Sequence, residues 1–549
     1  MVLKKITLIC AASLLIQSGL NAQNDVTNKV NSVLDLTMLQ VELSQAATNG
    51  QPDIINIGEG VFDLSLLNND LVYRPLPKPR VPKEEQYPLT IVGAGAGKTI
   101  FDAGKSTHKL IIMTGQLKDD MGASVTVKGI TFRNGGHSLA GGEAGLLIVT
   151  KRAMIEVRDC EFIAINKSRG PTLTASTGVK TGALGGIKVI GCKFDNLSST
   201  INLSNTWTNT SVEKSTFSNF RDNNALNIGS RKGVCVISKC TFKNNHSIIE
   251  APLNAFVFEG GTVEIAKSTF EDNFGTQGGA VEISGRESTI NFHENTLKNN
   301  SGGKSGSALI TMEGSGTITV ERNLFSENNN NTQGGGLTII TGGSKKAGVD
   351  DSKNYISVNN NIFSKNFTAG DGGGLYVEIR KGKAEIINNT IVNNKTMYSP
   401  KCNTAAGLCI KTISNDATAW IYNNIIWKNT CKDAPGIDLL IDNDPDASAV
   451  GWFLEPDGIG AKVFVSNNIV GKDDIKVKKS VEVKKQLNLD PYLDSDFKLK
   501  STSPAIDAGT SQGHGILGSK DFEGKKVPID GNGDGKKVVD IGAIEFKQK

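Results

Sequence analysis

The 549-residue sequence lacks the features of several large protein classes. The sequence contains 60 Lys and Arg residues and 56 Asp and Glu residues, which gives a net charge of +4. So small an excess of positive charge does not indicate a large basic surface for nucleic acid. No C-x2-C pair of pairs occurs, which argues against a structural zinc site. The 61 glycines follow no Gly-X-Y period, which excludes collagen, and 38% hydrophobic residues are too many for a wholly disordered chain.

The first 22 residues form a separate segment. Lys4 and Lys5 precede an apolar run over residues 6–16, and small and polar residues follow up to Ala22. This pattern predicts a secretory signal peptide over residues 1–22. The apolar run is far shorter than the ~20 residues of a membrane-spanning helix, and no later stretch is long enough either. We therefore expect an exported protein, at the outer cell surface, outside the cell or in the periplasm, with no transmembrane segment after cleavage.

A repeated phrase begins near residue 125. It consists of a β-rich strand, a small or polar residue, an apolar anchor and an Asn two or three positions later, as in STFEDN (268–273) and NIFSKN (361–366). Twelve anchors recur at spacings of 23 to 44 residues. Such a variable period indicates stacked coils joined by loops of different length. The anchors are Phe132, Phe162, Phe194, Phe217, Phe242, Phe270, Leu297, Phe325, Phe363, Ile391, Ile426 and Val470.

The segments between the anchors have the pattern of strands. GGAVEI (278–283), GGGLTII (334–340) and GGGLYVEIR (372–380) alternate apolar and polar residues at period two. No amphipathic helical window of useful length occurs there, which argues against helical solenoids. We predict an all-β fold, a right-handed parallel β-helix of about a dozen recognisable coils spaced ~4.8 Å apart.

Two interior columns are predicted from the repeat. The anchors should stack on one another in the core, and the residue two positions earlier should form a second column. There, Asn side chains could pass amide hydrogen bonds from coil to coil, so we interpret them as structural. This second column contains Cys160, Cys192, Ser215, Cys240, Ser268, Asn295, Asn323, Asn361, Asn389 and Asn424.

Seven cysteines remain after the predicted cleavage. An odd number in an exported chain means that at least one thiol is free or pairs elsewhere. Cys160 and Cys192 share a column and are predicted to be core thiols. Cys402, Cys409 and Cys431 lie in a later, looped region, where a disulfide between two of them is expected without the sequence saying which two.

Both ends of the predicted rod need covering, because open ends expose pairing edges. At the N-terminus, a short helix within residues 32–48 would place Leu36, Leu39, Leu43 and Ala46 on one face. In chain order, we expect a signal peptide over residues 1–22, an N-terminal cap with the first coils over 23–105, a parallel β-helix over 106–470 and a C-terminal cap segment over 471–549.

Two family resemblances follow from these motifs. LTIVGAGAGKTI (89–100), with the helix and GVF turn before it, resembles the N-terminal segment of secreted bacterial right-handed β-helix proteins. SPAIDAG (503–509) and DIGAIE (540–545) resemble their C-terminal segment of the choice-of-anchor Q type. FEDN (270–273) with the following GGAV is similar to repeats of polymorphic outer-membrane proteins, which are adhesin-like. These resemblances imply the fold and a role at the cell surface.

Two glycine-containing motifs invite ligand hypotheses. GAGAGKT (93–99) has Val92 where a phosphate loop needs Gly, so we interpret it as a glycine turn. Asp530, Asn532, Asp534 and Gly535 match the first half of a calcium loop, and Asp540 is close in sequence. They predict a calcium site in the C-terminal cap; the alternative is a pair of Asp/Asn-Gly turns without metal.

Functional residues are expected on an outer sheet face. The inward residues of the strands are taken to be Val281, Leu337, Leu375, Leu408 and Ile437. Alternation then places the catalytic candidates Tyr376, Arg380 and Lys411 on the outer face. It also places the substrate-binding candidates there, namely Glu282, Thr338, Glu378 and Asp438. The catalytic candidates could supply a base and a cation for uronic-acid chemistry. The alternative is a solvated sheet face of mixed charge.

Two function hypotheses therefore stay open. One is a monomeric, adhesin-like protein that binds cell-surface or matrix polysaccharide. The other is a polysaccharide lyase or glycoside hydrolase acting on the outer sheet face, although the sequence shows no polygalacturonase or pectate lyase signature.

Overall fold

The computed structural model describes most of the chain after its first 27 residues. The predicted signal peptide and Cys402 lie outside the described residues. The described residues are 28–29, 35–75, 87–104, 106–115, 122–135, 145–150, 153–165, 172–177, 185–205, 209–342, 350–397, 404–412, 416–432, 434–442, 461–476, 481–512, 516 and 519–548.

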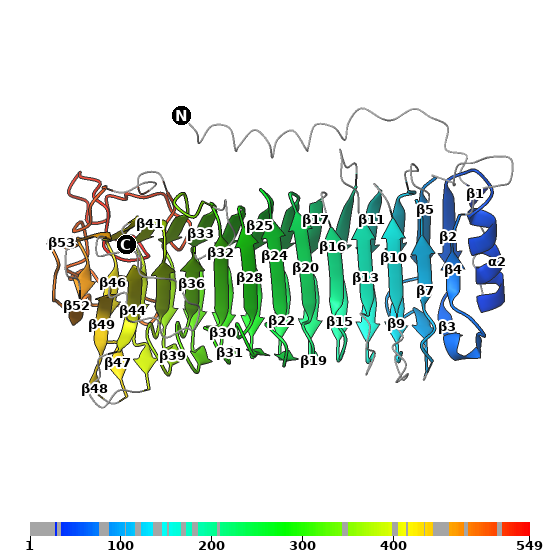
Figure 1. The fold of residues 1–549 in the computed structure, drawn as a ribbon, viewed down its shortest axis with the longest axis horizontal. Helices are drawn as coiled ribbons and strands as arrows, with labels where there is room; N and C mark the ends of the chain where they lie inside the picture. The colour runs from blue at the N-terminus through cyan, green and yellow to red at the C-terminus, as the bar shows by residue number, and fades with distance from the viewer. Residues whose placement is uncertain are drawn as a thin grey trace.

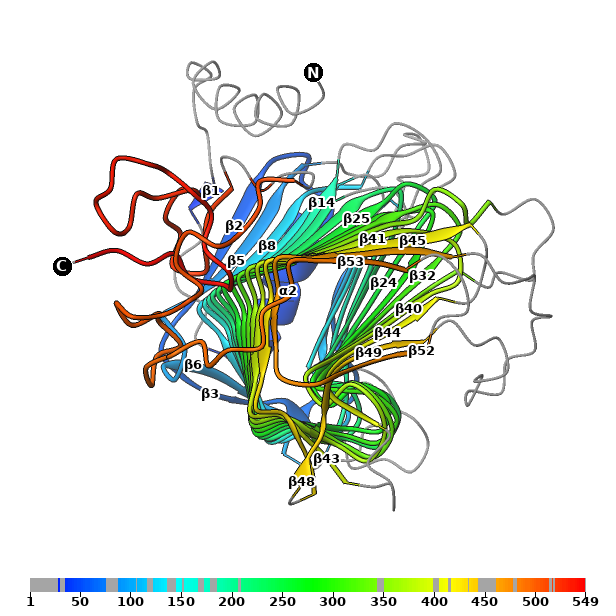
Figure 2. The same ribbon diagram turned by 90° about the vertical axis from the view of Figure 1, so that its left-hand side faces the viewer.

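The chain winds into a right-handed parallel β-helix, as predicted. Figure 1 shows the long rod from the side, with helix α2 (Leu36–Ala46) at one end. Each complete coil contributes strands to sheets A, B and C, and nine short strands of the described residues form a further sheet, here called the short sheet. In Figure 2 these sheets form the walls of a tube seen along its axis.

Sheet A is the longest sheet of the described residues, with sixteen strands. At about 4.8 Å per strand it spans roughly 70 Å, so the rod is longer than a dozen coils would make it. Its strands are β1 (Asn28–Lys29), β2 (Asp53–Ile57), β5 (Leu89–Gly93), β8 (Val125–Lys128), β11 (Met154–Arg158), β14 (Gly186–Ile190), β17 (Asn209–Glu213), β21 (Val234–Ser238), β25 (Thr262–Ala266), β29 (Thr289–His293), β33 (Thr317–Glu321), β37 (Tyr355–Asn359), β41 (Gly382–Ile387), β45 (Ala417–Tyr422), β50 (Lys462–Ser466) and β53 (Val481–Lys484).

Sheet B carries the predicted column of apolar anchors. Phe132, Phe162 and Phe194 stack with ring centroids 5.0 and 4.9 Å apart, and Phe325 stacks on Phe363 at 4.7 Å. The predicted ladder is therefore confirmed. The strands are β3 (Gly60–Asp63), β6 (Thr99–Asp102), β9 (Thr131–Arg133), β12 (Glu161–Ile163), β15 (Lys193–Asp195), β18 (Thr216–Ser218), β22 (Thr241–Lys243), β26 (Thr269–Glu271), β30 (Thr296–Lys298), β34 (Leu324–Ser326), β38 (Ile362–Ser364), β42 (Thr390–Val392), β46 (Ile425–Trp427) and β51 (Ile469–Val470).

In the described part of the chain, sheet C has fourteen parallel strands, and its outer face carries most of the predicted catalytic and substrate-binding residues. In β28, Val281 and Ile283 are fully buried while Glu282 between them is only partly buried. The strands are β4 (Leu71–Tyr73), β7 (Leu110–Met113), β10 (Leu146–Thr150), β13 (Leu173–Thr177), β16 (Ile201–Asn205), β20 (Leu226–Arg231), β24 (Leu253–Phe258), β28 (Val281–Arg286), β32 (Ala308–Glu313), β36 (Leu337–Thr341), β40 (Leu375–Ile379), β44 (Ala405–Thr412), β49 (Ile437–Asp442) and β52 (Asp473–Lys476).

The short sheet joins sheet B to sheet C in the later coils. Its first eight strands are parallel, and β48 pairs antiparallel with β47. The strands are β19 (Arg221–Asp222), β23 (His246–Ser247), β27 (Phe274–Gly275), β31 (Ser301–Gly302), β35 (Asn329–Asn330), β39 (Phe367–Thr368), β43 (Lys395–Thr396), β47 (Thr430–Cys431) and β48 (Ala434–Pro435).

Two asparagine ladders run along the rod. In the predicted one, Asn361 Nδ2 donates to Asn389 Oδ1 at 3.0 Å, and Asn323 Nδ2 donates to Asn361 Oδ1 at 2.9 Å. A second ladder uses the Asn that ends each repeat phrase. Both ladders satisfy buried polar groups at the corners of the coils. The second ladder consists of Asn245, Asn273, Asn300, Asn328, Asn366, Asn394 and Asn429.

The N-terminal end is covered by α2, as predicted. Asp35 caps this helix, because its Oδ1 accepts the backbone N–H of Met38 at 2.8 Å. Leu39 and Leu43 are buried in the main core. A short 3-10 helix, η1 (Leu64–Leu66), follows β3.

The C-terminal segment folds back along the side of the last coils. Figure 2 shows it, in orange to red, outside sheets A and B. Ala543 N–H donates to Thr390 Oγ1 of sheet B at 3.1 Å, and Ile516 and Val527 pack on Tyr422 of sheet A. Residues far apart in sequence therefore form one surface there.

Candidate functional site

The outer face of sheet C brings together six of the seven predicted site residues. Glu282, Thr338 and Tyr376 share one outward column, and Glu378 and Lys411 are paired in the next one. Arg380 follows Glu378 by two positions and reaches back to it. The period-two pattern was therefore sufficient to group these side chains.

At the C-terminal end of this face, the catalytic candidates form one polar network. Tyr376 Oη donates to Glu378 Oε2 at 3.1 Å, and Arg380 Nε donates to Glu378 Oε1 at 2.7 Å. Lys411 Nζ lies 3.8 Å from Asp371 Oδ2 and 5.8 Å from the centre of the Tyr376 ring. Each of these cations has a carboxylate beside it.

The two hydrogen bonds of this network lie within one strand segment, and Lys411 links that segment to the next strand. The phenol at its centre is not suited to proton abstraction. Tyr376 is 1% exposed, and burial followed by the nearby Glu378 raises the pKa of its phenol far above the usual value. A phenol with a raised pKa stays protonated at neutral pH and cannot act as a base. Glu378 is likewise 4% exposed.

Thr338, one of the predicted binding residues, has structural partners. Thr338 is 1% exposed, and its Oγ1 donates to the Gln333 carbonyl at 2.9 Å and accepts Gly306 N–H at 3.4 Å. It therefore fastens the glycine turn before β36. Its position on the outer column is as predicted, but its hydroxyl is already engaged.

Asp438 does not lie on the outer face, which corrects the sequence-based placement. Its Oδ1 accepts from Asn429 Nδ2 at 2.6 Å, so it ends the second Asn ladder. The reason is a register shift between β44 and β49, which pairs Leu439 with Leu408 in the inward column. Ile437, predicted inward, packs instead with outward Tyr376.

Glu282, at the N-terminal end of the face, differs from these residues because one of its carboxyl oxygens has no hydrogen-bond partner among the described residues. This oxygen, Oε2, is buried. Burial and the neighbouring Glu250 raise the pKa of Glu282 to about 7, against a smaller opposing effect of Lys304. Glu250 itself accepts from the side-chain amides of Asn224 and Asn254.

Aromatic rings lie beside this carboxyl group in the next outward columns. A Cβ added to Gly229 would lie 1.8 Å from Phe256 Cε2, so the Phe256 ring occupies the space that the missing side chain of Gly229 leaves free. The Arg286 guanidinium carbon lies 5.0 Å from the centre of the Phe258 ring. Both rings are partly exposed.

Sequence reasoning missed these rings, although a signal was present. LNAFVF (253–258) alternates in the same register as the neighbouring strands, which puts Phe256 and Phe258 outward beside Asn254. In the preceding coil Asn227 follows the same pattern, and its Oδ1 is buried with no hydrogen-bond partner in the described part of the chain. We call Asn227, Asn254, Phe256, Phe258, Glu282 and Arg286 the aromatic face.

The predicted calcium residues lie in turns of the C-terminal segment. Asp530 Oδ1 and Oδ2 accept Gly533 and Gly535 N–H at 2.9 and 3.1 Å, and Asn532 Oδ1 accepts Asp534 N–H at 3.0 Å. Asp540 is buried, and its carboxylate accepts N–H groups of the same segment. No group of three His, Cys, Asp or Glu suited to a metal occurs among the residues with a described placement, and calcium binding stays a prediction.

The cysteines of the predicted core column are buried thiols. Cys160 and Cys192 are 1% and 2% exposed and free, as expected for stacked core residues. The disulfide expected among Cys402, Cys409 and Cys431 stays a prediction, because Cys402 is outside the described residues. Within the described part of the chain, no helix is long and apolar enough to cross a membrane.

Comparison with known proteins supports the fold. Residues 177–353 match the family described as "right handed beta helix region". No curated protein matches the chain.

Three solved structures are similar to this chain at a low level. Tailspike protein 3 of bacteriophage CBA120 is 12% identical, with a TM-score of 0.41 over 89% of this chain and 70% of its own. A mutant of the PL6 family alginate lyase AlyGC is 11% identical, with a TM-score of 0.34 over 83% and 79%. The Agl-KA catalytic domain is 13% identical, with a TM-score of 0.37 over 77% and 68%.

Proposed function

We propose that this protein is exported and binds a surface or matrix polysaccharide along the outer face of sheet C. The observation that carries the proposal is the aromatic face, where two partly exposed phenyl rings lie beside a column of amide and carboxyl groups. The N-terminal signal-like sequence supports export.

The chemistry of the aromatic face matches that of a sugar ring. A pyranose has an apolar C–H side, which packs on an aromatic ring, and hydroxyl groups at its rim, which donate to oxygen acceptors. Asn227 Oδ1 and Glu282 Oε2 are buried acceptors without a partner among the described residues, and an unsatisfied buried acceptor costs about 1–3 kcal/mol. A bound hydroxyl would remove that cost.

The direction of the face suits a chain rather than a single sugar. Asn227, Asn254 and Glu282 are cross-strand partners in successive coils, so equivalent groups recur about every 4.8 Å along the rod. A linear glycan laid parallel to the rod axis would meet one set of contacts per coil. We therefore propose recognition of internal glycan segments.

The experiment is affinity electrophoresis and glycan-array binding of the full chain and of Phe256→Ala. Loss of one stacked ring should weaken retention by about fivefold to tenfold, because aromatic contacts contribute around 1 kcal/mol. Phe274→Ala is the matched control, since Phe274 is a partly exposed ring that stacks on His246 on the short sheet, away from sheet C. Equal retention of both variants, or no retention of the folded wild-type protein on a broad panel, would show that the proposal is wrong.

A second candidate function is glycan cleavage by the same face, and Glu282 is the observation that favours it. A carboxyl group with a pKa of about 7 is protonated in part at neutral pH and can act as a general acid. Incubation with neutral and uronate polysaccharides should then release reducing ends or an unsaturated, ultraviolet-absorbing product. Glu282→Gln should abolish release, whereas binding without release in the wild-type protein would leave the binding function alone.

A further inference from the structure

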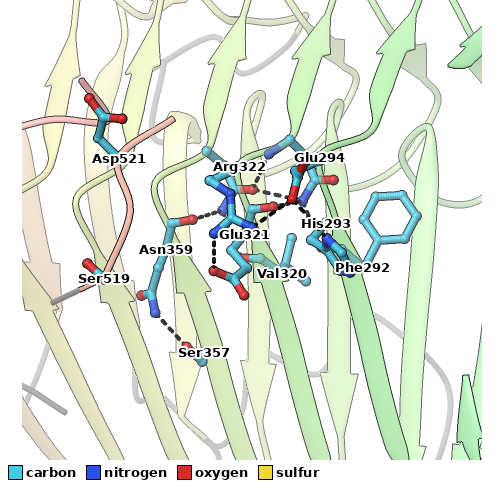
Figure 3. Close-up of polar contacts among 12 residues, drawn as sticks. Phe292, His293, Glu294, Val320, Glu321, Arg322, Ser357, Asn359, Ser519 and Asp521 are labelled. Carbon is cyan, nitrogen blue, oxygen red and sulfur yellow. Dashed lines mark hydrogen bonds and ion pairs between the residues drawn. The ribbon is translucent and has the colours of Figure 1, made fainter. Parts of the chain in front are cut away.

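A groove lies where the C-terminal segment crosses the outer face of sheet A. Its volume is about 170 Å³. Figure 3 shows Ser357 and Asn359 on the sheet and Ser519 and Asp521 on the segment that passes them. The described lining residues are Thr319, Glu321, Ser357, Asn359, Asn360, Ile387, Asn388, Ile516 and Ser519.

The floor of the groove is built from three consecutive coils. Thr319 of β33 pairs with Ser357 of β37. In the neighbouring outward column, Glu321 of β33 pairs with Asn359 of β37, and Asn359 pairs with Ile387 of β41. Strand alternation therefore repeats the same two outward positions from coil to coil. The floor is rigid, because inward neighbours such as Val320 and Val358 are fully buried.

Hydrogen-bonding groups of the floor are only partly engaged. Asn359 Nδ2 donates to Ser357 Oγ at 2.6 Å, as Figure 3 shows. Asn359 Oδ1 is buried, and no described residue donates to it. A buried amide oxygen without a donor is an acceptor for a ligand that brings an O–H or N–H group.

Charges beside the groove are neutralised within the protein. Arg322 donates to Glu321 at 2.7 Å and to Glu294 at 2.9 Å, while His293 Nε2 lies 3.4 Å from Glu264. Among the described lining residues there is a carboxylate, Glu321, but no Lys or Arg. The groove therefore disfavours an anionic ligand and offers hydroxyls, amides and one carboxylate to a neutral one.

We propose that this groove binds one neutral, hydroxyl-rich sugar ring, either free or at the end of a glycan. Ring hydroxyls would donate to Asn359 Oδ1 and Glu321 and accept from Thr319. The aliphatic side chains of Ile387 and Ile516 would contact the C–H side of the ring. This site lies on sheet A and is separate from the aromatic face on sheet C, so it does not rest on the proposed polysaccharide contact there.

The test is ligand-observed NMR and calorimetric titration of the full chain with neutral hexoses and pentoses, their methyl glycosides and the corresponding uronic acids. Saturable binding of at least one neutral sugar is expected, and its uronic acid should bind at least about tenfold more weakly. The reason is that the described lining offers its carboxylate no Lys or Arg, and the nearby Arg322 is already bonded to Glu321 and Glu294. Competition by neutral oligosaccharides that end in the same sugar would assign the site to glycan ends, and binding of the free sugar alone would assign it to monosaccharides.

Variants separate this groove from the aromatic face. Asn359→Leu keeps the branching at Cγ but replaces the amide with two methyl groups and so removes the acceptor, and binding of the neutral sugar should fall below detection. Ser519→Leu fills the groove from the C-terminal segment and should have the same effect even if Asn359→Leu disturbs the sheet. Phe274→Ala, on the short sheet and outside both proposed sites, should leave sugar binding unchanged.

Three results would overturn the proposal. They are no saturable binding of any neutral sugar by the folded chain, equal or tighter binding of uronic acids, and unchanged binding by both groove variants. Loss of polysaccharide retention in Phe256→Ala with intact sugar binding would leave the groove proposal standing and concern only the aromatic face.

Discussion

At the scale of single residues, the buried asparagines are the most demanding positions of the rod. Asn361 is 0% exposed, accepts the backbone N–H and the side-chain amide of Asn323, and donates to Asn389 and to the Val320 carbonyl. All its polar atoms are therefore engaged in a water-free corner. An apolar residue there would leave several donors and acceptors unpaired at once.

Asn361→Leu should lower the free energy of unfolding by about 3 kcal/mol or more, since each unsatisfied buried group costs about 1–3 kcal/mol. Urea unfolding followed by circular dichroism measures the change. Asn329→Leu is the control, because Asn329 is exposed, has no left-handed backbone conformation, and its side chain accepts a hydrogen bond from Ser301 Oγ at the surface. Its cost should stay within about 1 kcal/mol, and a similar loss in both variants would contradict a structural role for the ladder.

At the scale of elements, the C-terminal segment contains a buried acidic cluster. Glu545 accepts the N–H groups of Ile529 and Asp540, and Asp521 accepts Glu545 N–H. Burial and then the nearby Asp540 raise the pKa of Glu545 to about 8, and burial raises that of Asp540 to about 6. Packing this segment against sheets A and B therefore works against the ionisation of both groups.

The sign of the pH dependence follows directly. Between pH 4.5, the usual pKa of a Glu, and about pH 8, Glu545 keeps its proton in the folded segment but loses it in the unfolded chain. The contribution of Glu545 to the free energy of unfolding is therefore greatest below about pH 4.5 and decreases as the pH rises to 8. Hydrogen exchange of residues 519–548 should accelerate from pH 5 to 9 beyond the intrinsic rate increase. Glu545→Gln should flatten this excess.

Glu523→Gln serves as the control for that measurement. Hydrogen bonds from Lys498 and Lys525 hold the pKa of Glu523 below its usual value, so this group changes charge only below the tested range. Its variant should keep the wild-type slope. A slope unchanged in Glu545→Gln would show that the acidic cluster does not govern the attachment of the segment.

At the scale of the whole molecule, the rod depends on covering its ends. Among the described strands, every strand inside a sheet is paired on both sides, so the unpaired edges of this part of the chain lie where each sheet stops. Helix α2 covers the N-terminal end by burying Leu39, Leu43 and Ala46. Without that cover, two rods could pair end to end.

Leu43→Asp should therefore promote self-association. Leu43 is 0% exposed, and a buried charge would detach α2 from the core. Size-exclusion chromatography with light scattering should show concentration-dependent larger species. Val41→Asp is the matched control, because Val41 lies on the same helix with 48% of its surface exposed, and that variant should keep the mass distribution of the wild type.

The fold was readable from the sequence because it repeats. Phe132 and Phe162, or Asn361 and Asn389, stand at equivalent positions of adjacent coils, so local spacing predicts their contact. The i, i+2 spacing of Tyr376, Glu378 and Arg380 likewise predicted their common face. Asp438 was misplaced because a register shift between β44 and β49 leaves no mark in the sequence.

The sequence by itself determined the coil, its core columns and the side of the sheet on which most candidate residues lie, since strand alternation and stacking are local and periodic. Only the tertiary structure decided which candidates are available to a ligand. In the folded chain, Tyr376 and Arg380 donate hydrogen bonds to Glu378, and Phe256 lies over Gly229. Ser519 and Asn359 line the same groove although more than a hundred residues separate them in the sequence. Burial and long-range packing depend on the whole coil stack, which no local pattern encodes.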